Sequence, residues 1–300
     1  MPTKILLDTD IDIVGDIDDA MCLAYLLAQP ECDLLGITTV TWDTIQRAMV
    51  ASAICKAAGR QVPIYPGTST PLLVPLPSVS GTQPPQAERE VLDRWDHDET
   101  FPRGQAVEFM RQTIRAHPGE VVLLAIGPLT NVALLLAADP EIAGLLRGLV
   151  LMGGMFTSVV PGTGMREWNA LVDPHATAMV YRAPVRWHRS VGLDITCDLH
   201  MSAADVQERL GGEGPSLLRD MAELWFRKAG GITFHDPLAA ATIFDESICR
   251  FEPGAVEVEL ESRRLQGLTY WNPGGDRPPH EVAVSLDPRR FFEHYFALVR

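Results

Sequence analysis

The chain has 300 residues, a formal net charge of −14 and 46% hydrophobic residues. The negative charge argues against a nucleic-acid backbone or an anionic membrane surface as partner, because either would be repelled. No linker-like shift of composition divides the chain, and segments typical of strands and helices alternate throughout it. We therefore expect a single domain over residues 1–300, with a large hydrophobic core.

The five cysteines are scattered and show no paired short spacing, which favours a reducing compartment over a disulfide framework or a zinc site. The first residues lead straight into a short apolar strand and leave no room for the apolar core of a signal peptide. No apolar run approaches the length of a membrane span. We expect a cytoplasmic protein.

The first predicted strand is the apolar run at residues 5–7, and a helical pattern covers residues 20–27. Between them, the stretch Asp8 to Asp19 holds six aspartates and no basic residue. The junction of a strand with the following helix is a usual ligand position in α/β sheets. Six neighbouring carboxylates repel one another, so we expect a cation among them.

The cation is expected to be a hard divalent ion, calcium or magnesium, because such ions take oxygen ligands from carboxylates and backbone carbonyls. From the residues alone, Asp10, Asp18 and Asp19 are the candidate ligands. Asp16 is expected to cap the helix instead, because a short polar side chain accepts the free N–H groups of a first turn.

The next segments repeat the alternation of strand and helix. A strand rich in β-branched residues is predicted over 33–40, and a helix over 44–58. This order implies a parallel sheet, which places Asp10 and Asp43 at the same carboxyl edge. Residues 62–86 and the charged stretch 89–100 are expected to form a long irregular excursion, either a binding loop or a plain surface insertion.

Further elements follow the same rules of periodicity and turn chemistry. Asp173, before Pro174, is expected to cap a helix beginning near His175. The C-terminal part reads as a β extension closed by a capping helix. We predict an α/β fold with a mostly parallel, Rossmann-like central sheet flanked by helices. The remaining strands are predicted over 121–126, 148–152, 185–195, 255–260, 267–271 and 281–286, and the remaining helices over 104–116, 203–210, 215–228 and 289–299.

The unusual residues at the predicted strand ends resemble those of the nucleoside hydrolase family, of the inosine-uridine-preferring type. The matching pieces span nearly the whole chain in family order. They are Asp8-Thr-Asp10 ahead of Asp18-Asp19-Ala20, Gly127-Pro-Leu-Thr-Asn131, Leu151-Met-Gly-Gly154, Glu167-Trp-Asn169 with Asp173-Pro174, Gly192-Leu-Asp-Ile-Thr196, and His235-Asp-Pro-Leu-Ala239.

The resemblance implies hydrolysis of the N-glycosidic bond of ribonucleosides, with one calcium ion in the pocket and a homodimer or homotetramer as the assembly. It implies calcium ligation by the side chains of Asp10, Asp19 and Asp236 and by the backbone carbonyl of Thr130. The substrate-binding residues that it implies are Asp18, Asp43, Met152, Glu167 and Asn169. Trp42 and Trp168 are expected either to stack on the base or to pack as ordinary core.

The mechanism follows from the chemistry of the bond. Breaking a ribosyl C–N bond builds positive charge on the sugar, and needs an activated water on one face and a proton for the leaving base. Asp10 is expected to remove the proton from the water. His235 is expected to protonate the base, because imidazole titrates near neutrality.

Some alternatives stay open at this point. The loop from Ile11 to Ile17 is longer than in many members, so Asp12 or Asp16 could replace Asp10 or Asp18 at the ion. The segment 78–84 lacks a histidine that members often carry, and base preference is therefore not predicted. Two other readings are a non-catalytic, calcium-dependent nucleoside or sugar binder and, from the Asp8-Thr-Asp10 start, a magnesium-dependent phosphatase.

Overall fold

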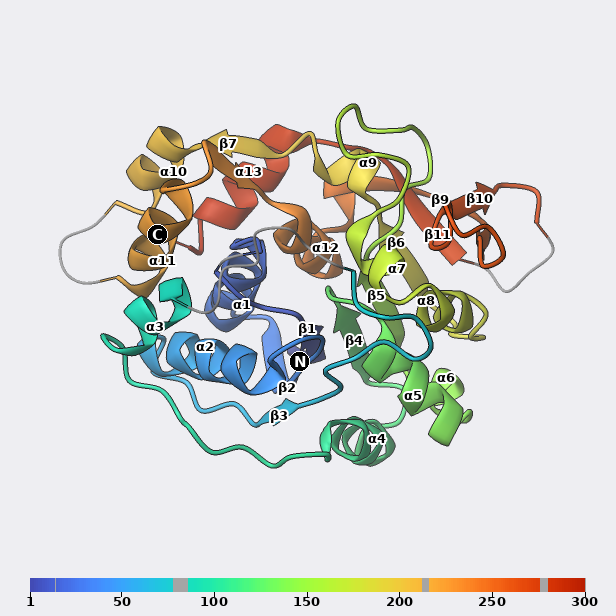
Figure 1. Cartoon of the computed structure of the whole chain (residues 1–300), viewed down its shortest axis with the longest axis horizontal. Coiled ribbons are helices and arrows are strands. Elements are labelled where there is room, and N and C mark those ends of the chain that lie inside the picture. The colour runs from blue at the N-terminus through green and yellow to red at the C-terminus, as the bar shows by residue number, and fades with distance from the viewer. Residues whose placement is uncertain (14, 78–85, 212–215, 276–279, 300) are drawn as a thin grey trace.

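The computed structural model describes residues 1–13, 15–77, 86–211, 216–275 and 280–299. Within them, one nine-stranded sheet runs through the molecule and carries helices on both sides (Figure 1). The α/β class predicted from the sequence is confirmed. The spatial order of its strands is β10 (Thr269–Asn272), β9 (Cys249–Val258), β11 (His280–Leu286), β6 (His188–Val191), β5 (Gly148–Met152), β4 (Val121–Ala125), β1 (Thr3–Thr9), β2 (Cys32–Thr39) and β3 (Ile64–Pro66).

Strand β1 lies where the strand order changes direction. It pairs in parallel with β2 on one side and with β4 on the other, and Asp8 stands opposite Thr38 and Ala125. The chain builds β2 and β3 first, then returns across β1 to build β4, β5 and β6. Ligands of open parallel sheets bind at such a switch point. The aspartates that follow β1 therefore emerge at the expected ligand position.

Side chains of β1 alternate between two hydrophobic cores, one on each face of the sheet. Ile5 and Leu7 belong to the first core and Leu6 to the second. Helices that contribute to the first core are α1 (Asp18–Ala28), α2 (Thr44–Ala57), α3 (Gln86–Leu92), α10 (Ala203–Arg209), α11 (Leu217–Phe226), α12 (His235–Phe244) and α13 (Pro288–Phe296). Helices that contribute to the second are α4 (Ala106–Ala116), α5 (Thr130–Ala138), α6 (Ile142–Leu145) and α8 (Pro174–Tyr181).

The C-terminal strands extend the central sheet at one edge. Strand β11 pairs in parallel with β6 and antiparallel with β9, which pairs antiparallel with β10. Strand β9 begins at Cys249, six residues before the predicted start at 255. Helix α13 packs against α1, where the Tyr295 hydroxyl donates to the Met21 carbonyl at 3.0 Å and the ring stacks on Tyr25. The predicted capping helix is confirmed.

One predicted strand is shorter than expected. The strand predicted over 185–195 is formed only at His188–Val191, and Leu193–Thr196 forms the short helix α9. The Gly192 carbonyl accepts from the N–H groups of Ile195 and Thr196, which turns the chain into a helix. Asp194 then accepts from the N–H groups of Phe156 and Thr157, at 3.2 and 2.8 Å. These contacts are tertiary, and the apolar run alone did not indicate them.

The excursion predicted over 62–100 is partly regular. Residues 64–66 add edge strand β3 to the sheet, and α3 packs against α2 and α11. Residues 78–85 of this excursion and Pro215, the predicted first residue of the 215–228 helix, lie outside the described residues.

A second, two-stranded sheet joins β7 (His200–Ser202) to β8 (Gly231–Thr233), and was not predicted.

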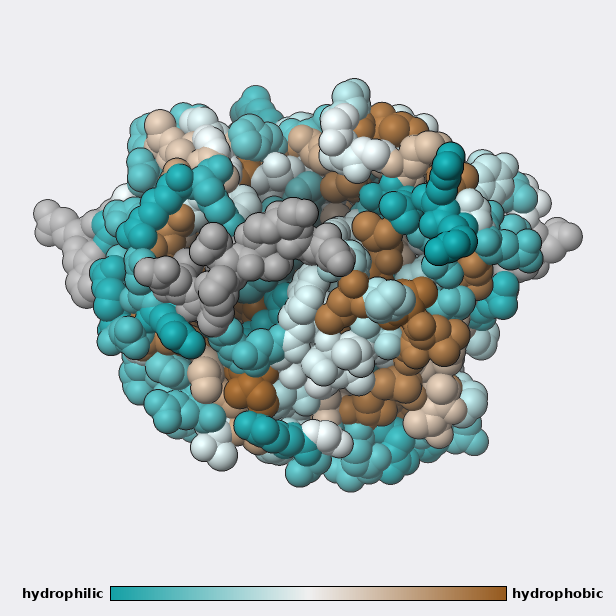
Figure 2. Space-filling model, viewed as in Figure 1, coloured by the Kyte–Doolittle hydropathy of each residue, from teal (hydrophilic) through white to brown (hydrophobic). Residues whose placement is uncertain are grey.

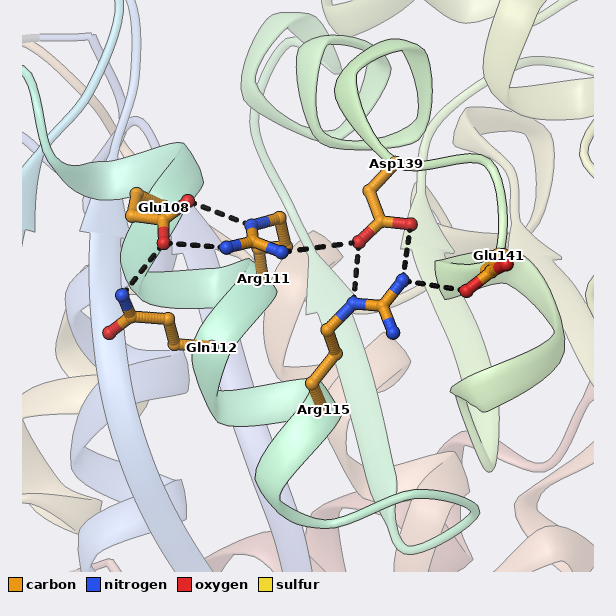
Figure 3. Close-up of polar contacts among 6 residues, drawn as sticks. All are labelled: Glu108, Arg111, Gln112, Arg115, Asp139 and Glu141. Carbon is orange, nitrogen blue, oxygen red and sulfur yellow. Dashed lines mark hydrogen bonds and ion pairs between the residues drawn. The ribbon is translucent and has the colours of Figure 1, made fainter.

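Helix α4 is tied to the α5–α6 connection by surface ion pairs (Figure 3). Arg115 donates to both oxygens of Asp139, at 2.6 and 2.7 Å, and to Glu141. Arg111 links Glu108 to Asp139.

Apolar residues gather around α5, α7 (Trp168–Val172) and α8 on the face seen in Figure 2. In the part of the chain that the structure describes, every helix is too short or too polar to cross a membrane.

Candidate active site

Three buried carboxylates form the centre of the site. Asp18 and Asp19 open α1, and Asp236 lies in the first turn of α12. Each offers a carboxylate oxygen, and these oxygens lie within 4.8 Å of one another. The Asp236 N–H also donates to Asp18 Oδ2 at 3.1 Å, which holds the two helix starts together. Residues 218 positions apart thus meet in one cluster.

Asp10 borders this cluster from the end of β1. Its negative charge raises the pKa of Asp18, Asp19 and Asp236. Its carboxylate also lies against Gly127 after β4, where an added Cβ would come within 2.7 Å of Asp10 Oδ1. Gly127 is needed at this point because a side chain would displace Asp10.

Burial raises the pKa of every carboxylate in the cluster. The pKa of Asp10 rises to about 6 and that of Asp18 to about 7, while those of Asp19 and Asp236 rise well above the ordinary value. Removal of a charged group from water has this effect, and neighbouring negative charges add to it. A divalent cation would relieve both costs, and the oxygen-only donor set suits a hard ion. The residues present therefore fit a metal centre.

Thr130 and Asn131 open α5, shortly after Gly127 in the chain. Thr130 is buried and donates its hydroxyl to Asp173 at 2.7 Å. The Asn131 amide donates to Asp8 Oδ1 at 2.8 Å and to the Thr39 carbonyl at 3.1 Å. Asn131 thus joins the carboxyl ends of β1 and β2 to α5, a structural role that the sequence did not indicate.

Asp173 is the N-cap of α8, as predicted, and accepts from Ala176 N–H at 3.0 Å.

Glu167, Asn169 and Met152 lie together beside the ends of β4 and β5. Glu167 is the N-cap of α7, and its carboxylate accepts from the N–H groups of Gly154, Asn169 and Ala170. The Asn169 amide donates to the carbonyls of Ile126 and Met152, at 2.9 and 3.1 Å. These side chains line a small hollow together with Gly153 and Gly154. Burial raises the pKa of Glu167 to about 7.

Asp43 is exposed and caps α2, where it accepts from Gln46 N–H at 3.0 Å. The preceding residues Thr41 and Trp42 have positive φ values of 70° and 52°, which non-glycine residues seldom adopt. The Trp42 ring stacks on Trp168, with centroids 5.8 Å apart and planes 23° apart. The two tryptophans thus pack on each other, and Trp168 keeps 37% of its surface exposed.

His235 opens α12 next to Asp236. Its Nδ1 lies 2.6 Å from the Thr196 hydroxyl. Burial lowers the pKa of His235, while the charge of Asp16 raises it. Asp16 does not cap α1, and that expectation is wrong. The N-cap position is Ile17, which makes no capping side-chain hydrogen bond with a described residue, and Asp16 Oδ1 accepts from Ile17 N–H.

Two residues near the site escaped the sequence analysis. Thr196 lies within the motif Gly192-Leu-Asp-Ile-Thr196, but no neighbouring residue in the sequence indicated its contact with His235. Arg47 is a lone arginine in α2 and is followed mainly by small and apolar residues, and that position was the signal available in the sequence. Its guanidinium lies 3.4 Å from Asp12, and its charge lowers the pKa of Asp10.

Comparisons with known proteins agree with this geometry. The family model described as inosine-uridine preferring nucleoside hydrolase matches residues 5–293. Uridine nucleosidase 1 of Arabidopsis thaliana is 29% identical, over 97% of this chain and 91% of that protein. Non-specific ribonucleoside hydrolase RihC of Salmonella agona is 32% identical, over 94% and 93%.

A solved structure titled as a plant nucleoside hydrolase, the PpNRh1 enzyme, superposes with a TM-score of 0.83 at 25% identity, covering 100% of this chain and 99% of that one. The match of the family model extends over nearly the whole chain, from β1 to α13. The chain therefore belongs to the inosine-uridine preferring nucleoside hydrolase family.

Proposed function

We propose that this protein hydrolyses the N-glycosidic bond of ribonucleosides to ribose and free base, with calcium as its cofactor. Membership of the family supports ribonucleoside hydrolysis. The proposal of a calcium site and of specific catalytic residues rests on one observation: His235, at the start of α12, directly precedes Asp236 of the buried carboxylate cluster. A cation site and a candidate acid are thus adjacent in the fold.

Calcium is proposed over softer metals because the cluster offers carboxylate oxygens only. The side chains of Asp10, Asp19 and Asp236 and the Thr130 carbonyl are the proposed ligands. Asp18 uses Oδ2 to accept from Asp236 N–H, and its other oxygen remains to accept from a ribose hydroxyl. The cation, when bound, supplies positive charge that favours deprotonation of water.

Asp10 is the proposed general base, and accepts the proton of the attacking water at a carboxylate oxygen. Its burial among other acids favours that uptake, since burial raises the pKa of Asp10 to about 6. The same negative charges stabilise the positive charge that develops on the sugar as the C–N bond breaks. One group of aspartates thus serves both the water and the sugar.

His235 is the proposed general acid. Thr196 occupies its Nδ1 at 2.6 Å, which leaves Nε2 to deliver a proton to the departing base. The Thr196 hydroxyl also lies 3.3 Å from the Leu193 carbonyl, to which it can donate. A hydroxyl that donates there accepts from His235 Nδ1–H, so the ring must also carry a proton on Nε2 when it acts as the acid.

The remaining substrate contacts are proposed for Asp43, Met152, Glu167 and Asn169. Asn169 uses its amide nitrogen to bind backbone carbonyls, so its oxygen is left for a sugar hydroxyl. Both carboxylate oxygens of Glu167 accept hydrogen bonds from backbone N–H groups, which fix the side chain in place. A homodimer or homotetramer and a cytoplasmic location stay predictions from the sequence.

The proposal is tested with inosine, adenosine, guanosine, uridine and cytidine, each with and without a chelator. Chelator-sensitive release of ribose and free base, restored by calcium, is the expected result. If the protein binds calcium and releases no base from any member of the panel, the hydrolase proposal is wrong.

A further inference from the structure

Arg47 is a buried cation beside the acidic cluster. It is 5% exposed, and its Nε donates to the Thr41 carbonyl at 2.9 Å. Its Nη2 lies 3.4 Å from Asp12 Oδ2, and its Nη1 lacks a partner among the described residues. Arginine is seldom buried unless paired. Asp12 is therefore the acidic partner that this guanidinium has in the fold.

Each carboxylate oxygen of Asp12 has a polar partner in the fold. Oδ1 accepts from Gly15 N–H at 2.5 Å, and Oδ2 faces Arg47. The group of carboxylates that meet within 4.8 Å comprises Asp18, Asp19 and Asp236, and both Asp10 and Asp12 are outside it, so the ion pair with Arg47 is what distinguishes Asp12 from Asp10. Asp12 is thus anchored on α2 through Arg47.

Arg47 also supports the other wall of the site. The Thr41 carbonyl to which it donates belongs to the turn with positive φ values, and the guanidinium carbon lies 5.9 Å from the centre of the Trp42 ring. Trp42 in turn stacks on Trp168, which precedes Asn169. One side chain therefore contacts both the acidic loop and the aromatic pair.

We propose that Arg47 is a positioning residue that holds Asp12 as its counter-ion, and thereby keeps Asp12 out of the cation's ligand set and leaves that place to Asp10. This inference rests on the proposed function. It resolves the choice between Asp10 and Asp12 that the long loop leaves open. A carboxylate that lost its partner would compete for the nearest positive charge, which here is the cation.

The test compares Arg47→Met, Arg47→Lys, Asp12→Asn, Asp236→Asn and the double variant Arg47→Met/Asp12→Asn with the unchanged protein. Calcium affinity is measured by titration calorimetry, and kcat and KM with the best nucleoside of the panel. Arg60→Met is the matched control, because Arg60 also donates to a backbone carbonyl, that of Leu27, but pairs with no residue of the acidic loop.

We expect Arg47→Met to lower kcat by about 10- to 100-fold without weakening calcium binding, because a misplaced loop misaligns the reacting groups. Adding Asp12→Asn should restore kcat to within about threefold of Asp12→Asn alone, since the two residues act through one pair. Arg47→Lys, which keeps the charge, should lose less than Arg47→Met, and Arg60→Met should match the unchanged protein.

The inference is overturned if the double variant is as slow as Arg47→Met, or if Asp12→Asn weakens calcium binding as strongly as Asp236→Asn does. Calorimetry needs no substrate. If the unchanged protein hydrolyses no nucleoside, the proposed function fails, while unchanged calcium binding by Asp12→Asn would still support the exclusion of Asp12 from the ligand set.

Discussion

The Thr196 hydroxyl lies 2.6 Å from Nδ1 of His235, although the two residues are 39 positions apart and belong to different helices. Thr196 is fully buried, so this contact excludes water from one edge of the imidazole. The contact fixes the orientation of the ring and leaves Nε2 as its free nitrogen. The assignment of His235 as the acid therefore depends on Thr196.

Thr196→Val removes this hydrogen bond while keeping the side-chain volume. We expect kcat for a nucleoside to fall by about tenfold with little change in KM, since general acid catalysis contributes roughly 100- to 10,000-fold in all. Hydrolysis of p-nitrophenyl riboside, whose leaving group needs no proton, should be nearly unaffected in both Thr196→Val and His235→Ala. An equal loss with both substrates would show that Thr196 only supports the fold.

Asp236→Ala should abolish calcium binding and hydrolysis together, because Asp236 joins α12 to the carboxylates of α1. In the unchanged protein, calcium at about 100 times its Kd should add roughly 2.7 kcal/mol to the free energy of unfolding, and this gain should be absent in the variant. Thermal melts with and without calcium measure the difference. The exposed Asp33→Asn serves as control and should keep the full gain; full activity of Asp236→Ala would refute the ligand assignment.

Asn131→Ala should lower the free energy of unfolding by about 1–3 kcal/mol, because it leaves buried partners at Asp8 and Thr39 without their donor. Asn131→Asp should cost more, since it places a second carboxylate against Asp8, whose pKa burial already raises to about 7. Urea unfolding of both variants gives the values. Variants as stable as the unchanged protein would contradict the structural role of Asn131.

A buried histidine pair predicts a loss of stability in mild acid. The rings of His188 and His280 lie 4.2 Å apart, and burial lowers the pKa of His188 to about 3 and that of His280 well below its usual range. A lowered pKa means that the unfolded chain binds the protons first. The stabilising effect of the neutral pair is complete above pH 6.5, the ordinary histidine pKa, and is lost as the pH falls from there toward 3.

Between pH 6.5 and 3, each histidine should make the free energy of unfolding fall with decreasing pH by up to about 1.4 kcal/mol per pH unit. His188→Phe removes one of the two titrating groups, so its free energy of unfolding should depend less steeply on pH between 6 and 4 than that of the unchanged protein. Urea midpoints at each pH, taken with calcium present, give the comparison. Calcium is included because the raised pKa values of Asp18 and Asp236 have the opposite effect, lost as the pH rises. Parallel curves for the two proteins would contradict the prediction.

The sequence determined the features that depend on near neighbours. Apolar periodicity and turn residues predicted the parallel sheet, and Asp173 before Pro174 predicted the cap of α8 that the structure has. The carboxyl ends of parallel strands share one edge, so the position of Asp10 near the Thr130 segment could be predicted as well. These outcomes follow from local hydrogen bonds and from the geometry that every such sheet has.

The tertiary structure decided which side chains meet. Asp16, expected as a cap, lies one residue before the N-cap position, and Asp12, an open candidate for the cation, pairs with Arg47. Residues 193–196, expected to continue a strand, form a helix that brings Thr196 to His235. Each of these outcomes depends on contacts between segments far apart in the sequence. Packing of whole elements sets such contacts, and the pattern of one segment carries no information about the partner that folds against it.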